Sequence, residues 1–461
     1  MSHPELGRIA KALRGTEFEG RAWLVGGAVR DELLGRAVGN DIDIVVRGDA
    51  SKAADILWQK KVASIAPVTY PRFGTAMVRV GHKQIEFATA RKESYDDDSR
   101  KPTVEPATIE EDASRRDFTV NTLLRDLFSG ELVDPLGTGE RDLRNKVLRT
   151  PRDPVETFHD DPLRMLRAVR FRWQLGFAAA PGLYDAVRNE AERLKIISSE
   201  RIRDELTIML GLDDGHKCLA DLMDLGLMHH IAPEFETGVG VEQGPYHYLD
   251  VWDHTLEVVR NTGSGDLTLR LAAWLHDVAK PQCRTVEGGR IKFLGHEQEG
   301  AKLAEAILRR LTFSLDECKD VALLVLHHMR FTGIEQFSDT AARRILRDLG
   351  EQTERLVQLG EADAAAHAEN VKRPDFNEVR NVLQRVAEET PPERLQSPLS
   401  GDEIMELTGL SAGPKVGKVK HHLSEMVIEG ALDPDDMASA RTVALEFVRD
   451  SASKERDTAY D

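Results

Sequence analysis

Cysteine is scarce in this chain, which has only three among 461 residues: Cys218, Cys283 and Cys318. Their number is odd and they form no CxxC pair, which argues against a disulfide framework and against a thiolate zinc site. No stretch approaches the roughly 20 consecutive apolar residues that a membrane helix requires, and the start of the chain lacks the apolar core of a signal peptide. We therefore expect a protein of the reducing cytoplasm without a membrane partner.

An excess of positive charge is also missing, since the formal net charge is −17. The charges are unevenly spread: residues 1–175 hold 29 Lys and Arg against 28 Asp and Glu, and the remainder holds 33 against 51. An acidic C-terminal two-thirds does not attract a polyanion through its overall field. A phosphate-rich ligand is therefore expected on the N-terminal third.

The length exceeds what a single hydrophobic core usually fills, so several domains are expected. Strand patterns occur at residues 21–25 and 41–46, a helix pattern follows Gly26-Gly27, residues 74–89 predict a hairpin, and residues 91–112 predict a loop. From Pro154 onward, helix-period patterns dominate. This order predicts an α+β head followed by a long all-α region.

Asp41 and Asp43 lie two residues apart on a predicted strand, so their side chains point to the same face. Neighbouring carboxylates repel unless a cation lies between them, and Mg²⁺ binds one or two carboxylates together with phosphate oxygens. The pair therefore favours two-metal phosphoryl or nucleotidyl transfer. Taken alone, the pair is more typical of two solvated acids. Glu86 is either a third acid that faces the metal or an ordinary exposed strand residue.

Gly26-Gly27 closes the first strand and opens a helix. Because Gly27 has no Cβ atom, its backbone can approach a phosphate at the start of a helix. Arg30, on the first helical turn, can add a bidentate phosphate contact. Together with the two acids, these groups are what nucleotidyl transfer requires.

The segment DDPLRMLRAVRF, residues 160–171, predicts a helix with Asp161 as N-cap and Pro162 at the first helical position. Asp161 and Arg164 also have the polarity of a base-selecting pair. Cytosine and adenine both offer an amine donor beside a ring-nitrogen acceptor, whereas uracil and guanine offer the opposite polarity. An Asp acceptor beside an Arg donor therefore accepts the first two bases. Helix capping and base selection both remain open for Asp161.

The motifs LVGGAVRDELLG, NDIDIVV, EEDASRRDFTVN, DPLGTGERDL and DDPLRMLRAVRF follow one another over roughly residues 20–210. In this order they resemble the class II tRNA nucleotidyltransferase family, which comprises CCA-adding enzymes and bacterial poly(A) polymerases. The resemblance implies a polymerase-β-like head that uses Mg²⁺, with CTP, ATP and the 3′ end of tRNA as partners.

The same resemblance assigns roles to the arginines. It implies that Arg116, the second arginine of RRDF, contacts the nucleotide. It also implies that Asp161 and Arg164 act as an EDxxR template for the base, with Asp160 in place of the usual Glu. Arg167 and Arg170 match further nucleotide-contacting arginines of the family.

Histidines and carboxylates recur in the helical region, at His254, His276-Asp277, His296, His327-His328 and Asp363. Imidazole and carboxylate together suit a divalent metal that activates water. Over roughly residues 245–370 the pattern resembles the HD phosphohydrolase domain. This implies a divalent metal held by His254, His276, Asp277 and Asp363. An inactive HD domain with the same buried helices is the alternative.

These motifs divide the chain into a nucleotidyltransferase head (1–150), a helical neck and body for base selection and RNA binding (151–243), an HD domain (244–370) and a helical tail (371–461). The leading hypothesis is addition of CCA to the 3′ end of tRNA with release of pyrophosphate, with or without phosphohydrolase activity. The alternatives are an enzyme that adds only CC or only A, a poly(A) polymerase, and an HD phosphohydrolase whose head only binds RNA. The stretch YPRFGTAMVRV departs from the GRRFR-type segment of poly(A) polymerases and favours the tRNA enzyme.

Overall fold

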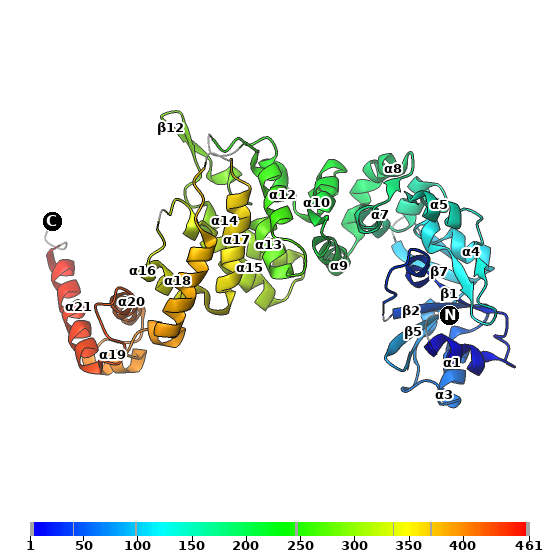
Figure 1. Ribbon diagram of the computed structural model, residues 1–461, viewed down its shortest axis with the longest axis horizontal. Helices are drawn as coiled ribbons and strands as arrows, with labels where there is room; N and C mark the ends of the chain where they lie inside the picture. The colour runs from blue at the N-terminus through cyan, green and yellow to red at the C-terminus, as the bar shows by residue number, and fades with distance from the viewer. Residues whose placement is uncertain are drawn as a thin grey trace. The chain divides into compact units, whose positions relative to one another are not determined.

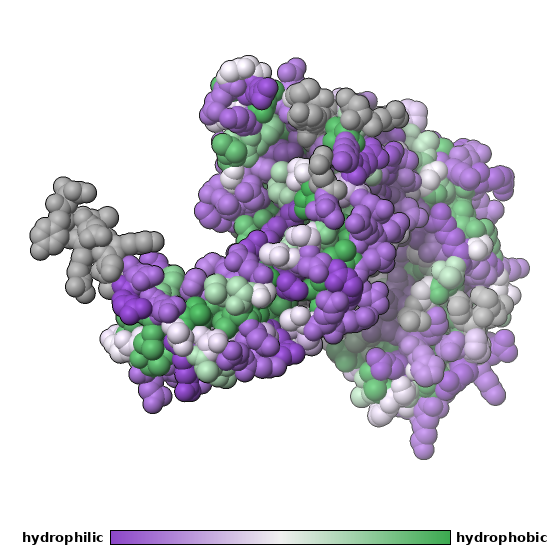
Figure 2. Space-filling view, turned by 60° about the vertical axis from the view of Figure 1, so that its left-hand side comes forward, coloured by the Kyte–Doolittle hydropathy of each residue, from purple (hydrophilic) through white to green (hydrophobic). Residues whose placement is uncertain are grey.

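The computed structural model describes residues 4–39, 41–96, 99–244, 248–334, 336–368 and 371–457. The chain forms two compact units, Met1–Glu236 and Thr237–Asp461 (Figure 1). No helix within the described ranges combines the length and the apolar character needed to cross a membrane. On the face drawn in Figure 2, hydrophilic side chains predominate and hydrophobic ones are interspersed among them.

A seven-stranded sheet forms the head of the first unit, with the order β3-β4-β5-β2-β1-β8-β9. β2 pairs parallel with β5 and antiparallel with β1, which places it at the centre of the sheet. The strand bounds are β1 Ala22–Val25, β2 Asp41–Val46, β3 Val68–Tyr70, β4 Thr75–Val80, β5 Lys83–Thr89, β8 Leu124–Asp126 and β9 Leu132–Val133. The two predicted strands and the predicted hairpin are thus confirmed.

The two faces of β2 have opposite character. Ile42 and Ile44 are buried, whereas the side chains of Asp41 and Asp43 are exposed, as the two-residue period of a strand requires. α3, Ala50–Gln59, packs on β2, β4 and β5, and α1, Pro4–Leu13, packs on α3. These helices cover the apolar face of the sheet and leave the acids on the other face.

The expected loop over residues 91–112 is wrong. β6, Arg91–Asp96, pairs antiparallel with β7, Ser99–Pro106, and α4, Ile109–Ser114, follows; residues 97 and 98 lie outside the described ranges. The segment is rich in charge, and Lys92 on β6 pairs with Glu105 on β7 at 2.9 Å. A capping box between Thr108 and Glu111 starts α4.

Helices make up most of the remainder of the first unit. Their bounds are α2 Gly27–Leu33, α5 Gly139–Asn145, α6 Pro154–Asp160, α7 Leu163–Leu175, α8 Leu183–Glu190, α9 Ser199–Leu210, α10 Gly215–Asp224 and α11 Met228–Ile231. α7 packs against both α9 and α10. In this region α7 and α9 therefore lie side by side, close to the C-terminal end of α4.

The second unit is predominantly helical. Its bounds are α12 Val251–Asn261, α13 Leu267–Leu275, α14 His296–Arg310, α15 Leu315–His327, α16 Asp339–Leu349, α17 Thr353–Ala365 and α18 Phe376–Glu389. α12, α13 and α15 all pack on α17. A small hairpin interrupts the helices, with β12 at Thr285–Glu287 and β13 at Arg290–Lys292; the helix-period patterns alone did not predict it.

A three-helix tail ends the described chain, with α19 Gly401–Thr408, α20 Pro414–Ile428 and α21 Met437–Asp457. The three helices enclose a core that includes Ile404 and Leu423. Glu425 on α20 pairs with Arg344 and Arg347 on α16, at 2.8 and 2.6 Å. The tail therefore adds to the same compact unit as the helices before it.

Candidate functional site

Asp41 and Asp43 lie on the open face of β2, next to the turn that follows β1. β1 and β2 pair so that Val25 lies opposite Asp43. The residue after Val25 is Gly26, where a Cβ atom would lie 3.8 Å from Asp43 Oδ2 and 3.9 Å from Arg116 Nη1. Gly26 has φ 74°, a conformation that favours glycine. The dihedral angle explains the glycine at this position, and the two distances show that Asp43 and Arg116 lie on either side of the turn.

The carboxyl group of Asp43 lies among other charged groups. Although the residue is open to solvent on this face of the sheet, the protein atoms around the carboxyl raise its pKa, Arg116 opposes this, and the charge of Asp41 raises it further. Glu86 lies opposite Asp43 across the parallel β2–β5 pair; burial and the charge of Asp43 raise its pKa as well. A divalent ion bound at this face would relieve the repulsion between these acids. Glu86 is exposed, and both roles considered for it, a third metal-facing acid and an ordinary strand residue, stay predictions.

Arg30 lies on the first turn of α2, but its guanidinium faces inward. Nη1 donates to Asn121 Oδ1 at 2.7 Å, Nε donates to Asp31 at 2.8 Å, and the side chain is only 6% exposed. The guanidinium also lies over the ring of Phe171, 5.0 Å from its centroid. Arg30 thus joins α2 to the segment at residue 121 and to α7. Its contact with a phosphate, like that of Gly27, stays a prediction.

A pocket of about 230 Å³ opens where α4, α7 and α9 meet. Four of the predicted nucleotide-binding residues line it together with four others; the complete lining is Arg115, Arg116, Asp117, Asp161, Leu163, Arg164, Arg167 and Arg201. Because Arg116 also lies beside Asp43, the pocket and the acidic pair share one arginine.

Asp161 and Arg164 face this pocket with defined partners. The predicted start of α7 is one residue too early, because Pro162 is the N-cap and the helix begins at Leu163. Asp161 Oδ1 still accepts the Leu163 N–H at 3.2 Å. Arg201 pairs with Asp161 Oδ2 at 3.1 Å, and Arg164 Nη2 donates to the Arg115 carbonyl at 2.7 Å. The bond to Leu163 uses part of one carboxylate oxygen, so Asp161 retains acceptor capacity toward the pocket.

Arg167 and Arg170 are fixed by carboxylates. Arg167 donates to Asp117 Oδ2 through Nε and Nη2, at 2.9 and 2.5 Å. Arg170 donates to Glu205 at 2.6 Å and is 6% exposed, and it does not line the pocket. Of the two, Arg167 lies where a nucleotide can reach it. The nucleotide contact assigned to Arg170 stays a prediction, and its described role is to join α7 to α9.

Six side chains form a second site in the helical unit. They divide into two groups of potential metal ligands, His254, His276 and Asp363 in one and Asp277, His296 and His328 in the other. Asp277 lies between them: Oδ2 is 3.0 Å from His276 Nε2, and Oδ1 is 3.5 Å from His296 Nε2. Ligand atoms about 2.1 Å from one ion lie about 3.0–3.4 Å from one another. These separations suit two ions that share the carboxylate of Asp277.

The histidine tautomers are compatible with this interpretation. The Nδ1 atoms of His276, His296 and His328 each donate to a backbone carbonyl three residues earlier, at 2.8, 2.7 and 2.7 Å. In the neutral ring the lone pair is then on Nε2, the tautomer of a metal-bound histidine held by an outer hydrogen bond. His296 Nε2 and His328 Nε2 face each other at 3.2 Å. A cation between the two nitrogens, either a proton or a metal ion, relieves the repulsion of lone pairs at this distance.

The acids of this centre stay ionised. Burial alone would raise the pKa of Asp277, but His276 and Lys280 outweigh it and hold the pKa well below its usual range. For Asp363, burial is likewise outweighed, here by the hydrogen bond and charge of His254, and the pKa is lowered. Both carboxylates are therefore available to a metal at neutral pH.

Several residues of the two sites were not among the sequence-predicted ligands. His296 and His328 belonged to the recognised histidine pattern without an assigned ligand role. Arg201 lies in SERIRDEL, where its spacing of four from Glu205 on α9 signals a shared helix face. Arg115 and Asp117 flank Arg116. Arg115 pairs with Asp112, three residues earlier, whereas Asp117 pairs with Arg167, 50 residues away, a contact that no local pattern indicates.

The fold and the first site define a nucleotidyltransferase: a carboxylate pair on a polymerase-type sheet beside an arginine-lined pocket. Residues 22–149 match the Poly A polymerase head domain family, residues 176–238 the probable RNA and SrmB-binding site of polymerase A, and residues 246–368 the HD domain family. The chain belongs to the tRNA nucleotidyltransferase and poly(A) polymerase family, which depends on divalent metal. The resemblance predicted from the motifs is thereby confirmed.

Similar curated proteins have three different activities in their names. The chain is 35% identical to an A-adding tRNA nucleotidyltransferase of Deinococcus radiodurans, covering 88% of this chain and 92% of the relative. It is 34% identical to a CC-adding tRNA nucleotidyltransferase of Thermus thermophilus (91% and 92% covered). It is 31% identical to a multifunctional CCA protein of Xanthomonas campestris pv. campestris (83% and 96% covered).

Solved structures of similar fold agree with the predicted fold class. The Bacillus stearothermophilus CCA-adding enzyme in complex with CTP aligns over 98% of this chain and 100% of its own, with a TM-score of 0.68 at 23% identity. The Thermotoga maritima CCA-adding enzyme complexed with tRNA aligns over 96% and 94%, with a TM-score of 0.57 at 21% identity. The polymerase-type α+β head with a helical remainder is thus confirmed.

Proposed function

We propose that this chain adds the sequence CCA to the 3′ end of tRNA, using CTP and ATP and releasing pyrophosphate. The observation that carries the proposal is the shared position of Arg116, between the acidic pair and the arginine pocket. A triphosphate that reaches from the pocket to Asp43 must pass this guanidinium. A nucleotide whose base lies in the pocket therefore places its triphosphate near Asp43, where the phosphate bond is broken.

The acids and Arg116 have different roles in this reaction. Asp41 and Asp43, assisted by Glu86, would hold Mg²⁺. When bound, the ions lower the pKa of the RNA 3′-hydroxyl and neutralise the leaving pyrophosphate. Arg116 meets the charge of the triphosphate.

The pocket selects the base of the incoming nucleotide. Asp161 accepts from the exocyclic amine of cytosine or adenine, and Arg164 donates to the adjoining ring nitrogen. Uracil and guanine present a carbonyl oxygen to Asp161 and a ring N–H to Arg164, so neither hydrogen bond forms. A buried polar group left without its partner costs about 1–3 kcal/mol, which gives the pocket its discrimination.

The direct test supplies the purified chain with tRNAs that end at the discriminator base, at C and at CC, and sequences the extended products. Addition of CCA, CA and A respectively is the expected result. The addition of only CC or only A, or of an A-tract, identifies a partial enzyme or a poly(A) polymerase and contradicts the proposal. Asp41→Ala should abolish all incorporation, whereas Asp55→Asn, an exposed acid on α3, should leave it intact.

A second activity is favoured by the six-ligand centre: we propose that the HD domain is a metal-dependent phosphohydrolase with two divalent ions. The lone pairs of His296 and His328 that face each other carry this proposal. The test is hydrolysis of p-nitrophenyl phosphate by the Mn²⁺-loaded chain. His276→Ala should abolish hydrolysis and leave nucleotide addition unchanged; loss of both activities, or of neither, contradicts two separate sites.

A further inference from the structure

The open face of the head sheet extends well beyond the two acids of β2. Strand pairing sets its residues in rows: Asp43 lies opposite Glu86 on β5, and Glu86 lies opposite Met77 on β4. Val68 on β3 lies opposite Met77 and continues the row. Because directly paired residues of neighbouring strands point to the same face, this row runs from Asp43 to the edge of the sheet.

Two adjacent rows complete the face. Asp41 lies opposite Gln84, and Gln84 lies opposite Arg79 on β4. In the row on the other side, Tyr70 on β3 lies opposite Thr75. Neighbouring strands are about 4.8 Å apart, so Arg79 lies about 10 Å and Tyr70 about 14 Å from β2 across the sheet.

The side chains at the β3 edge of this face are open to solvent. Tyr70 is 47% exposed and Val68 is 41% exposed. Arg79 is exposed, and no described residue forms a hydrogen bond or ion pair with its guanidinium. By contrast, Ala76 and Val78, which alternate with these residues on β4, are buried on the face that α3 covers. An exposed aromatic ring and an exposed guanidinium on one face fit a ligand with both flat bases and negative charge.

The nucleoside triphosphate reaches the acids from the opposite direction. Gly26 follows β1, Arg116 lies beside it, and β1 flanks β2 on the side away from β5. In phosphoryl transfer the attacking oxygen and the leaving group lie in line, on opposite sides of the phosphorus. With pyrophosphate on the β1 side, the RNA 3′-hydroxyl therefore approaches from the β5 side, across the face that carries Arg79 and Tyr70.

We propose that the last nucleotides of the RNA substrate lie across β5, β4 and β3, with a phosphate at Arg79 and a base stacked on Tyr70. Met77 and Val68 form the apolar floor between them. A strand with about 3.4 Å per nucleotide covers the distance from β2 to Tyr70 in about four nucleotides, so these contacts fall on the RNA close to its 3′ end. Stacking on an aromatic ring tolerates any base, which suits an end whose sequence changes with each addition. The inference rests on the tRNA extension proposed above.

Steady-state addition of CMP by the full-length chain, to tRNA that ends at the discriminator base, tests these contacts. Tyr70→Ala combined with Arg79→Met should raise KM for tRNA by about tenfold or more. KM for CTP should stay within about twofold of wild type, because CTP binds on the β1 side. Tyr70→Phe, which retains the ring, should behave as wild type. Arg14→Met, an exposed arginine directly after α1, is the matched control for the lost charge.

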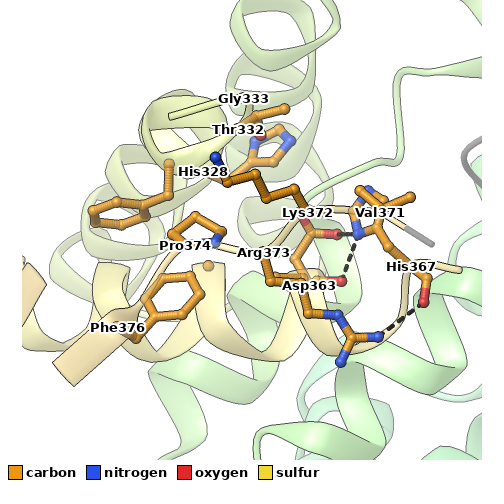
Figure 3. A pocket seen from close by; sticks show the side chains of 13 residues that line it. His328, Thr332, Gly333, Asp363, His367, Val371, Lys372, Arg373, Pro374 and Phe376 are labelled. Atoms are coloured by element: carbon orange, nitrogen blue, oxygen red, sulfur yellow. Dashed lines mark hydrogen bonds and ion pairs between the residues drawn. The ribbon is translucent and has the colours of Figure 1, made fainter. Parts of the chain in front are cut away.

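Salt dependence supplies a readout that a merely structural role of Arg79 would not change. The slope of the logarithm of tRNA affinity against the logarithm of salt concentration should become shallower by about 0.7–0.9 in Arg79→Met, because one phosphate contact is lost. The slope should be unchanged in Tyr70→Ala. All variants should keep the metal content of the HD centre, since its candidate ligands His328 and Asp363 line a pocket in the second unit (Figure 3).

The outcomes separate this inference from the proposed function. A wild-type chain that extends tRNA, with KM for tRNA and the salt slope unchanged in the double variant, overturns the contacts at Tyr70 and Arg79 and leaves CCA addition standing. A double variant that keeps its tRNA affinity but changes its sedimentation would identify the β3 edge as a protein contact and overturn the inference likewise. A wild-type chain that adds no nucleotide to tRNA overturns both.

Discussion

Asp112 Oδ2 accepts hydrogen bonds from Nε and Nη2 of Arg116, at 3.2 and 2.9 Å. The other oxygen, Oδ1, accepts from Arg115 Nη2 at 2.7 Å and from the Arg91 amide at 3.3 Å. Burial would raise the pKa of Asp112, but Arg116 and Arg115 outweigh it and lower the pKa. One ionised, buried carboxylate thus holds the arginine beside Asp43 and anchors the start of the β6–β7 hairpin.

Replacement of this carboxylate should damage catalysis through Arg116. Asp112→Asn leaves two guanidiniums without their charged partner, and loss of one member of a buried pair costs about 3–5 kcal/mol. We expect KM for both CTP and ATP to rise by about tenfold or more and the melting temperature to fall. Glu110→Gln, an exposed acid on the same helix, is the control and should behave as wild type. Wild-type KM values in Asp112→Asn would show that Arg116 needs no such support.

Arg164→Ala should relax the choice of base. The variant lacks the donor to the ring nitrogen, and a well-placed bidentate contact gives about 1–3 kcal/mol of discrimination. UTP and GTP should therefore compete with CTP and ATP about tenfold or more better than in the wild type, as measured by single-nucleotide incorporation. Arg188→Ala, on the exposed face of α8, should keep the wild-type preference. Unchanged discrimination in Arg164→Ala would remove the base-selecting role.

The Asp117–Arg167 pair should make stability depend on pH in a defined direction. Burial would raise the pKa of Asp117, but Arg167 and the hydrogen bond from Asn121 outweigh it and hold the pKa far below its usual range. A lowered pKa in the folded state means that the unfolded chain binds the proton first as the pH falls. The stabilisation is therefore complete above pH of about 4, the ordinary pKa of Asp, and is lost below it.

Urea unfolding of wild type and Asp117→Asn at several pH values tests this dependence. The difference between their midpoints should be largest near neutral pH and should shrink below pH of about 4. Asp185→Asn, an exposed acid on α8, should follow the wild type throughout. A constant difference between wild type and Asp117→Asn would contradict the stabilising ion pair.

Metal analysis tests the division of the HD centre into two groups. The wild-type chain should bind two divalent ions there, and His296→Ala should lower the content to about one, because His254, His276 and Asp363 remain in place. His421→Ala, an exposed histidine in the tail, should keep the full content. A single ion in the wild type, unaffected by His296→Ala, would reduce the centre to one metal.

The features that sequence predicted best are local. Asp41 and Asp43 share a face because a strand repeats every two residues, and the Gly-Gly turn precedes them within the same motif. The hydrogen bond from the Leu163 N–H to Asp161 also depends only on neighbouring residues. The predicted α+β head and the helical remainder follow from periodicities that extend over whole elements, and both are confirmed.

The features that sequence missed are mostly long-range. Arg30 donates to Asn121, 91 residues away in the sequence, and no local pattern predicts this contact. Arg201 reaches Asp161 over 40 residues. The β6–β7 hairpin was mistaken for a loop because the segment is polar and acidic and lacks a clear alternation of apolar residues. The contacts of Arg30 and Arg201 are tertiary, whereas the hairpin is a local element that composition alone did not reveal.

The central claim is that Asp41 and Asp43 hold the divalent ions of nucleotidyl transfer. The most direct measurement is single-turnover addition of labelled CMP to tRNA that ends at the discriminator base, over a range of Mg²⁺ concentrations, with Asp43→Asn beside the Asp55→Asn control. The account predicts a loss of about a hundredfold or more in Asp43→Asn at every Mg²⁺ concentration, and wild-type rates in the control. A rate in Asp43→Asn within about twofold of wild type would contradict it.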